Sequence, residues 1–485
     1  MPTVLMVLAG VYVLVMAVFL ISENRRPQAT LAWLLVLLVA PGLGLIIYIL
    51  FGRDWKAFSK QSTLRRQELK PAAMPLLAPL LSLQDTEIRR LEARGGGHQK
   101  LMMLIRRNSY SALTRRNRVE ILQNAAAFYP RMIEDLEAAK HSIHLQYFIW
   151  RSDELTERLK EILITKARAG VEVRLLYDPV GSQSTSRAYV RELRDAGIHT
   201  APTSPYWRLH TISYRNHRKI TVVDGVIGYT GGMNIGQEHV DGGDGFDLWR
   251  DTQIRIAGES ASILQAIFMV DWHNAVDENL FDAAYFPLSS TDASFQDDVP
   301  EDGVPVQLLP SGPDSRWAAI RQLYFFMIVT AQRHVYLQSP YFIIDASLAE
   351  ALRSAALAGV DVKVMLSARP SGDPVPEWAG NTFMAEIVSS GVKIYLYEKG
   401  YLHAKTISVD SEICSIGSAN LDIRSFSINY ELNAVLYDAE LARELERDFA
   451  RDLEDCTEFD AVAYDRRNPL VRFRDSCARL LSPLL

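Results

Sequence analysis

The residues best suited to chemistry lie in two short stretches that share one pattern. In "NHRKITVVDG" from Asn216 and in "LHAKTISVDS" from Leu402, a Lys follows a His by two residues and an Asp follows it by seven. A single H-x-K is incidental in most chains, so the repetition is what indicates function. The two sets are His217, Lys219 and Asp224, and His403, Lys405 and Asp410.

Each set is followed by small residues and an Asn in the same register. Side chains two apart on a strand point to the same face, so each His lies beside its Lys. Glycine lets the backbone approach an anion closely. The two halves together therefore predict one site with two imidazoles, two ammoniums and two amides. The small-residue runs contain Gly231, Gly232 and Asn234 in the first copy, and Gly417, Ser418 and Asn420 in the second.

This set of groups suits transfer of a phosphoryl group from a phosphodiester. Lysines and asparagines are donors for the non-bridging oxygens of one phosphate, where charge develops. One imidazole can attack phosphorus while the other protonates the leaving alcohol, and imidazole titrates near pH ~6.5. A monoester or a nucleotide would normally also call for Mg²⁺ and carboxylate ligands, and none cluster here. We therefore expect a diester handled with no metal and no cofactor.

Composition excludes some classes of function. The 485-residue chain is long enough for two or three domains, each with its own core. The formal net charge of −6 argues against a general nucleic-acid binder, because phosphate contacts call for a basic excess. The three cysteines have no metal-ligand spacing and are typical of reduced thiols in a cytoplasmic compartment.

Strand-like and helix-like segments occur in the same order in both halves. An Ala-Gly pair precedes one strand in each half, and the motif His follows that Gly by 47 residues in the first half and by 44 in the second. This indicates an internal duplication of one α/β unit. The matching segments are "HSIHLQYFIW" (141–150), a helix at 153–169 and "VEVRLLYD" (171–178), then "HVYLQSPYFI" (334–343), a helix at 346–358 and "VDVKVMLS" (360–367).

The alternation predicts an α/β protein with two tandem, pseudo-symmetric α/β/α sandwich domains. Each domain is expected to contain a largely parallel sheet covered on both faces. The stretch at 287–304, which contains Pro, Asp and Ser, is the expected boundary between the two domains. The predicted parts are a transmembrane helical hairpin at 1–52, a helical connector at 53–117, a first domain at 118–290, and a second domain at 291–485 that ends in an amphipathic helix.

The N-terminus contains two uncharged runs, residues 2–22 and 29–52, each about long enough to cross a bilayer core. A cleaved signal peptide is disfavoured, because no basic segment precedes the first run and no small-x-small site follows it. Pro41, Gly42 and Gly44 interrupt the second run, which leaves a kinked span and a re-entrant hairpin open. Six basic residues follow the second run against two between the runs, which predicts a cytoplasmic body and N-terminus.

At the repeated H-x-K-x4-D and G-[GS]-x-N patterns, the chain resembles the phospholipase D superfamily over most of residues 118–440. More narrowly, it is similar to bacterial cardiolipin synthases. The resemblance implies two phospholipase D-like domains and a metal-independent, two-step transfer through a phosphohistidine. The stretches that carry it are "LAWLLVLLVAPGLGLIIYILFG" (31–52), "FDLWRDTQIRIAG" (246–258) and "SANLDIRSFSINYELN" (418–433).

The resemblance also implies carboxylates that hold the histidines, placed at Asp251 in the first half and at Glu431 in the second. Asp224 and Asp410 are expected to support the site from the strand end rather than to touch substrate. Gly232 and Ser418 are expected to support the site as well. The residues expected to hold the phosphate oxygens are Lys219, Lys405, Asn234 and Asn420.

The resulting interpretation is a phosphatidyltransferase anchored in the bacterial inner membrane by two helices. It joins two phosphatidylglycerol molecules into cardiolipin and releases glycerol. His217 attacks phosphorus and His403 acts as acid and then as base, an assignment that rests on the family's usual division of roles. A phospholipase D that uses water, a transphosphatidylase with another acceptor, and a homo-oligomer stay open, whereas a nuclease and a non-enzymatic scaffold are disfavoured.

Two further stretches suggest membrane contact. The loop at 203–216 interleaves Tyr206, Trp207 and Tyr214 with arginines, which suits the headgroup zone or an ordinary inward-packed loop. The tail at 468–485 places Leu470, Phe473, Cys477, Leu480, Leu481 and Leu484 at helical spacing. This pattern fits a helix on an anionic bilayer and equally a helix docked on its own domain.

Overall fold

The structure is a computed structural model that describes residues 2–23, 27–48, 52, 56–82, 84–93, 98–109, 111–204, 213–243, 245–289, 300, 303–315 and 317–484. The chain divides into two compact units. The smaller unit holds residues 1–58 and 206–213, and the larger holds residues 59–205 and 214–485. All the predicted site residues belong to the larger unit.

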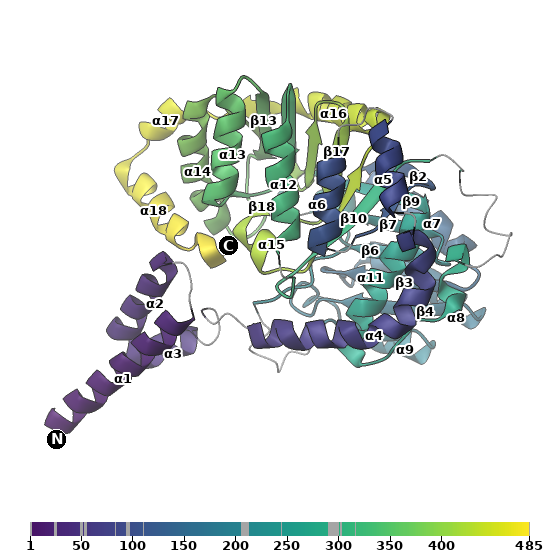
Figure 1. Cartoon of the computed structure of the whole chain (residues 1–485), viewed down its shortest axis with the longest axis horizontal. Coiled ribbons are helices and arrows are strands. Elements are labelled where there is room, and N and C mark those ends of the chain that lie inside the picture. The colour runs from purple at the N-terminus through teal and green to yellow at the C-terminus, as the bar shows by residue number, and fades with distance from the viewer. Residues whose placement is uncertain are drawn as a thin grey trace. The chain divides into compact units, whose positions relative to one another are not determined.

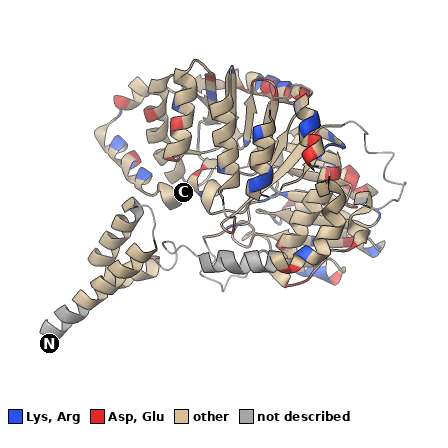
Figure 2. Cartoon of the chain, viewed as in Figure 1, with Lys and Arg blue, Asp and Glu red and all other residues tan. Residues whose placement is uncertain are grey.

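Three helices form the described part of the smaller unit: α1 (Pro2–Ser22), α2 (Pro27–Val39) and α3 (Pro41–Ile47). Helix α2 ends at Val39 because the residue before a proline avoids helical conformation. Gly44 lets α3 lie close to α2, since a Cβ there would lie 2.8 Å from the carbonyl oxygen of Val36. In Figure 2 the described parts of these helices are tan, since they contain no Lys, Arg, Asp or Glu.

The described part of the second apolar run therefore forms two short helices rather than one continuous helix. Within the residues that the structure describes, no helix combines the length and the apolarity that a membrane crossing needs. The predicted connector follows as α4 (Lys56–Ser82), α5 (Gln84–Ala93) and α6 (Gln99–Ser109), and its glycines at 95–97 lie outside the described residues.

The larger unit contains two sheets with the same strand order. Figure 1 labels some of the strands of each sheet. This common order confirms the two tandem units of an α/β fold. In the first sheet the order is β2 (Asn117–Gln123), β9 (Thr252–Gly258), β7 (Ile227–Gly231), β6 (Ile220–Val223), β3 (Ser142–Tyr147), β4 (Glu172–Tyr177) and β5 (His199–Pro202). In the second it is β10 (Val306–Ser311), β19 (Glu431–Leu436), β17 (Ile413–Gly417), β16 (Thr406–Val409), β11 (His334–Gln338), β13 (Asp361–Ser367) and β14 (Lys393–Tyr397).

The second sheet has one further strand at each edge. Strand β1 (Leu113–Thr114) pairs with β10, so the end of the predicted connector belongs to this sheet. Strand β20 (Cys456–Glu458) pairs with β14 at the other edge. Part of the predicted boundary between the two domains lies outside the described residues, namely 290–299 and 301–302.

Corresponding helices accompany the two sheets. One hydrophobic cluster contains residues of β9 and α11 together with residues of β10, β19 and α16, so the two halves share a core. The helices are α7 (Asn124–Ala138), α8 (Glu154–Arg168), α9 (Arg187–Asp195) and α11 (Glu259–Val276), then α12 (Ala319–Thr330), α13 (Ala346–Leu357), α14 (Val375–Ile387) and α16 (Ala439–Leu453). Shorter elements are α10 (Glu238–Asp241), α15 (Ile423–Ser427), α17 (Ala461–Asp465), β12 (Phe342–Ile343) and β18 (Leu421–Asp422).

The prediction of largely parallel sheets is wrong. Only β3, β4 and β5, and correspondingly β11, β13 and β14, pair in parallel, and the other pairs of each common set are antiparallel. The reason is a tight turn after each motif strand. Asp224 and Gly225 have φ of 52° and 68°, and Asp410 and Ser411 have φ of 56° each. Two successive residues of positive φ reverse the chain into an antiparallel hairpin, so β6 pairs with β7 and β16 with β17.

The turn aspartates also bind the start of the central strands. Asp224 accepts hydrogen bonds from the backbone N–H groups of Lys140, His141 and Ser142 at 2.7–2.8 Å. Asp410 accepts from Gln332, Arg333 and His334 at 2.7–2.9 Å. Each aspartate lies at the opposite end of its strand from the motif His.

The two stretches predicted to contact the membrane have different outcomes. Residues 205–212, including Tyr206 and Trp207, lie outside the described residues, whereas Arg215 is buried and donates to Asp178 at 3.3 Å. Helix α18 (Pro469–Leu480) packs on α14 and buries Asp475 and Ala478.

The same helix leaves an apolar stripe in solvent. Leu470, Phe473 and Leu480 are 76%, 68% and 80% exposed, respectively. The helix therefore docks on its own domain by one face and presents the other outward.

Replacing Asp410 by Asn should lower the free energy of unfolding by about 1–3 kcal/mol at pH 7, because three backbone donors lose a charged acceptor. Burial alone would raise the pKa of Asp410, but these amides hold it below its usual range. The stabilisation is present above the unfolded pKa of about 4 and is lost as the pH falls through the folded value. Thermal unfolding of the full chain in detergent should thus separate wild type and variant at pH 7 and less so in acid. Asp195→Asn, at an exposed helix end, is the control, and an equal effect there would contradict the prediction.

Candidate active site

His217 is held at two points by the second half of the molecule. It lies just before β6, and its backbone N–H donates to the carbonyl oxygen of Tyr430 at 2.9 Å. Its Nδ1 lies 3.0 Å from both carboxylate oxygens of Glu431, the first residue of β19. A carboxylate that accepts from Nδ1–H fixes the tautomer and leaves Nε2 with a free lone pair.

His403 is held in the same way by the first half. It follows β15 (Tyr401–Leu402), which pairs in parallel with β8 (Trp249–Arg250). The backbone N–H of His403 donates to the carbonyl oxygen of Arg250 at 2.7 Å, and Nδ1 lies 2.6 Å from Oδ2 of Asp251. The structure thus pairs each predicted carboxylate with the histidine of the opposite half.

The small residues after each motif make room for these carboxylates. A Cβ on Gly232 would lie 2.1 Å from Oδ1 of Asp251, so any side chain there would displace it. Ser418 occupies the corresponding place and donates to Oε2 of Glu431 at 2.5 Å. Close approach to an anion was expected here, and at Gly232 the observed anion is the protein's own Asp251.

Both motif lysines are fully buried. The ammonium of Lys219 donates to the carbonyl oxygen of His217 at 2.7 Å, and that of Lys405 donates to the carbonyl oxygen of His403. Neither forms an ion pair with a carboxylate among the residues that the structure describes. Burial lowers the pKa of Lys219 to about 7 and that of Lys405 to about 8, against the opposing effects of Glu431 and Asp251. Two buried amino groups without a paired carboxylate are suited to hold an anion, because the anion favours their charged form.

The motif asparagines are buried near these groups. The side-chain oxygen of Asn234 accepts from the backbone N–H of Ile149 at 3.2 Å, which leaves its NH₂ group as a donor. Asn420 is buried at the corresponding position after β17. No group of three His, Cys, Asp or Glu side chains suited to a metal ion is found in the described part of the chain.

The charges of the two motifs act on each other. Burial lowers the pKa of His217, with Glu431 opposing the shift and Lys219 and Lys405 adding to it. Burial also lowers the pKa of His403 well below its usual value, and Lys405, Lys219 and His217 lower it further. Both imidazoles are therefore neutral near pH 7. Because each histidine is affected by the lysine of the other half, the two motifs form one electrostatic site.

The supporting carboxylates differ in their pKa. Burial raises the pKa of Asp251, although Lys405 and Lys219 oppose this effect. Burial alone would also raise the pKa of Glu431, but His217, Lys219 and the Ser418 hydroxyl hold it below its usual value. The two carboxylates therefore hold their histidines with similar geometry, but the pKa of Asp251 is raised and that of Glu431 is lowered.

Aromatic rings lie close to both motif histidines, and they were not predicted from the sequence. The ring of Phe148 lies 4.9 Å from that of His217. The rings of Trp249, Tyr401 and His239 lie 5.6, 5.8 and 6.0 Å from that of His403. Trp249 stands two residues before Asp251 and Tyr401 two residues before His403, a proximity in sequence that could have indicated both.

Comparisons with known proteins agree on one family. The family described as "Cardiolipin synthase, PLD-like domain" matches residues 132–272 and 324–453, and "Phospholipase_D-nuclease N-terminal" matches residues 9–53. A cardiolipin synthase of Geobacillus thermodenitrificans is 41% identical over 477 residues, covering 96% of this chain and 91% of the relative. The major cardiolipin synthase ClsA of Bacillus subtilis is 37% identical over 480 residues, covering 98% and 97%.

A solved structure shares the fold. Phosphatidylserine synthase of Haemophilus influenzae superposes with a TM-score of 0.59 at 16% identity, and the match covers 80% of this chain and all of that one.

Proposed function

The chain belongs to the cardiolipin synthase family of phospholipase D-like proteins, and we propose that it transfers a phosphatidyl group from one phosphatidylglycerol to another. The products are cardiolipin and glycerol. The observation that carries this proposal is the shared site, in which two neutral histidines, each bonded to a carboxylate of the opposite half, accompany two buried lysines.

In the proposed first step, Nε2 of His217 attacks the phosphorus of one phosphatidylglycerol. The N–P bond forms as the bond from phosphorus to the glycerol oxygen breaks. His403, which takes up a proton once the anionic phosphate occupies the site, gives that proton to the glycerol oxygen. Lys219 and Lys405 neutralise the phosphate oxygens, with Asn234 and Asn420 as further donors.

In the second step, His403 takes a proton from the headgroup hydroxyl of a second phosphatidylglycerol. That oxygen attacks phosphorus, the N–P bond breaks, and cardiolipin is released. His217 is then free again, so the cycle consumes no co-reactant. The assignment of attack to His217 follows the family's usual division of roles.

Water is the rival acceptor. A phosphohistidine can be resolved by any hydroxyl held in line with phosphorus, so the protein must raise the effective concentration of the lipid hydroxyl above that of water. The aromatic rings of Trp249, Tyr401 and Phe148 beside the histidines support exclusion of water at this point. This supports transfer over hydrolysis.

We also propose that α1, α2 and α3 hold the protein at the bacterial inner membrane, with the larger unit in the cytoplasm. The support is the charge-free sequence of these helices and the basic residues that follow residue 52. Confinement to the bilayer surface would make lipid the commonest encounter partner of the site.

Phosphatidylglycerol alone, given to the purified full chain in mixed micelles, should yield cardiolipin and glycerol in equal amounts. Phosphatidic acid should be a minor product. Because one phosphodiester replaces another, the equilibrium constant should lie near one, and added glycerol should convert cardiolipin back. Lipid chromatography with a glycerol assay measures both. Phosphatidic acid as the main product, with no reversal, would establish a hydrolase instead.

His217→Ala and His403→Ala should each reduce cardiolipin formation by at least about 10³-fold, because nucleophile and acid act as one unit and their losses are not additive. Acid-quenched wild type should retain a phosphatidyl group on the peptide that contains His217, detected by mass spectrometry. His199→Ala, at an exposed position on β5, is the control and should keep full activity. Near-normal turnover in either motif variant would refute the shared site.

Cys477, which is exposed on α18, reports the orientation of the larger unit. In spheroplasts, a membrane-impermeant maleimide should label it only after the membrane is permeabilised. Cys477→Ser provides the background from the other two cysteines. The full chain should also stay in the membrane pellet after carbonate extraction. Labelling in intact spheroplasts would place the body outside, and release by carbonate would contradict the anchor.

A further inference from the structure

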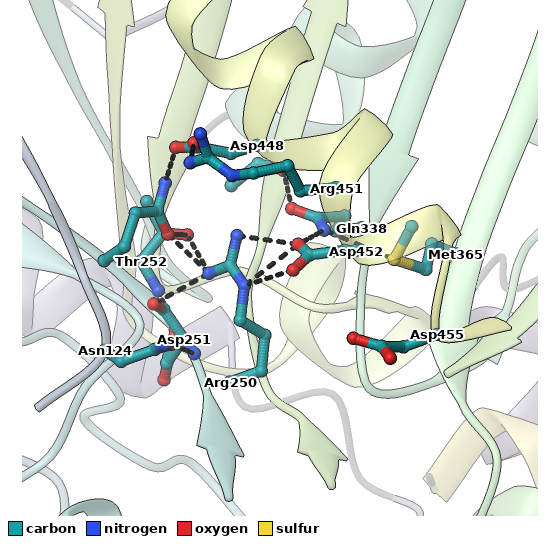
Figure 3. Close-up of polar contacts among 12 residues, drawn as sticks. Asn124, Arg250, Asp251, Thr252, Gln338, Met365, Asp448, Arg451, Asp452 and Asp455 are labelled. Atoms are coloured by element: carbon teal, nitrogen blue, oxygen red, sulfur yellow. Dashed lines mark hydrogen bonds and ion pairs between the residues drawn. The ribbon is translucent and has the colours of Figure 1, made fainter. Parts of the chain in front are cut away.

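A buried arginine lies next to Asp251, the residue that holds His403. Arg250 places Nε 2.9 Å from both carboxylate oxygens of Asp452 on α16, across the boundary between the halves. Its Nη1 donates to the carbonyl oxygen of Asp251 at 3.0 Å, as Figure 3 shows. Gln338 of β11 donates to the same Asp452 at 2.8 Å.

A second buried arginine serves Glu431, the residue that holds His217. Arg218 places Nη1 2.7 Å from both carboxylate oxygens of Asp271 on α11. Its Nε donates to the carbonyl oxygen of Glu431 at 3.1 Å, across the same boundary. Gln146 of β3 donates to Asp271 at 2.7 Å.

The two arrangements match although the arginines do not correspond in the duplication. Gln146 lies opposite Ile220 and Gln338 lies opposite Thr406, each the third residue after its motif histidine. The glutamines are therefore equivalent. In contrast, the counterpart of Arg218 in the second motif is Ala404, and the counterpart of Arg250 before Glu431 is Tyr430.

The same geometry is thus built from two unrelated positions. Inheritance of one ancestral arginine by both halves does not explain it. A structural requirement at each motif histidine explains the common geometry. At both histidines a guanidinium joins an aspartate on a helix to the main chain of the residue whose carboxylate orients the histidine. In each pair one guanidinium nitrogen contacts both carboxylate oxygens, and charge-assisted bonds from a planar guanidinium add geometric specificity as well as energy.

We propose that the Arg250–Asp452 and Arg218–Asp271 pairs are positioning residues for Asp251 and Glu431, and through them for His403 and His217. Each guanidinium fixes the carbonyl group of the orienting residue and hence the direction of its side chain. Displacement of a reacting group by about 1 Å can cost about 10²-fold in rate. The Arg250–Asp452 pair crosses the boundary between the halves, and at the other histidine the bond from Arg218 to the carbonyl oxygen of Glu431 crosses it. Docking of the halves and alignment of the histidines are therefore one event.

Another buried Arg–Asp pair in the same chain serves as a control. It separates a positioning role from general structural support. Arg255 of β9 donates to Asp135 of α7 at 2.7 and 3.0 Å, and both residues are buried. This pair lies within the first half, and within the described part of the chain neither member is hydrogen-bonded to Asp251 or Glu431. Asp135→Asn therefore weakens another buried Arg–Asp pair without touching the orienting carboxylates.

The test uses the full chain in mixed micelles with two substrates, and it rests on the function proposed above. Phosphatidylglycerol needs protonation of its leaving glycerol, whereas phosphatidyl-p-nitrophenol releases p-nitrophenolate without a general acid. Asp452→Asn should lower kcat on phosphatidylglycerol about 10²-fold with KM nearly unchanged. The same variant should still release one p-nitrophenolate per site in a rapid burst.

Asp271→Asn affects the attacking histidine and should lose the burst together with turnover. Arg250→Lys keeps the positive charge but loses the planar guanidinium and its several N–H donors. It should therefore behave as Asp452→Asn does. Asp135→Asn should lower the melting temperature while both substrates react at wild-type rates. A burst retained by Asp271→Asn and lost by Asp452→Asn would still support positioning, with the roles of the two histidines exchanged.

Equal losses on both substrates in Asp452→Asn and in Asp271→Asn alike, or the same pattern in Asp135→Asn, would overturn the positioning role. These outcomes are independent of the product test. Wild type that makes phosphatidic acid instead of cardiolipin would refute the proposed function, yet the burst experiment would still measure positioning.

Discussion

The hydrogen bond between each histidine and a carboxylate of the opposite half is the interaction on which this molecule depends. His217 with Glu431 and His403 with Asp251 are buried, and no pair lies within one half. A buried carboxylate is costly unless it is bonded, and a neutral imidazole donor meets that need. Each half therefore supplies the carboxylate that the motif histidine of the other half requires, and neither half alone orients its own motif histidine.

The shared core follows from the same constraint. Residues of β9 and α11 pack with residues of β10, β19 and α16 in one hydrophobic cluster. Short parallel pairing of β15 with β8, and the bridge of Asn216 to Tyr430, bring the main chains together beside each histidine. The duplication thus produced an obligate pair of units within one chain, whose active groups meet only at the boundary.

The lysines give this boundary its chemical character. Burial of an ammonium without a carboxylate partner is unfavourable, which is why the pKa of Lys219 falls to about 7 and that of Lys405 to about 8. The unfavourable charge is relieved when an anion enters the site. The folded site is therefore suited to bind an anion such as a phosphate. The turn aspartates, at the other ends of the motif strands, hold those strands in place.

The sequence by itself determined the parts that are local. The repeated H-x-K-x4-D pattern, the small residues after it and the apolar N-terminus are readable because each depends on residues close together in the chain. The carboxylates Asp251 and Glu431 were named from family resemblance, yet their partners were not, since contacts over 152 and 214 residues leave no periodic signal.

Tertiary structure decided the rest. The hairpins after β6 and β16 made the sheets mixed, because positive φ at Asp224 and Asp410 reverses the chain where alternation alone suggested parallel strands. Gly232 serves the protein's own Asp251, and two arginines at unrelated positions converge on one geometry. Such features arise only when two surfaces dock, because burial then dictates which charged groups must be paired and from which side.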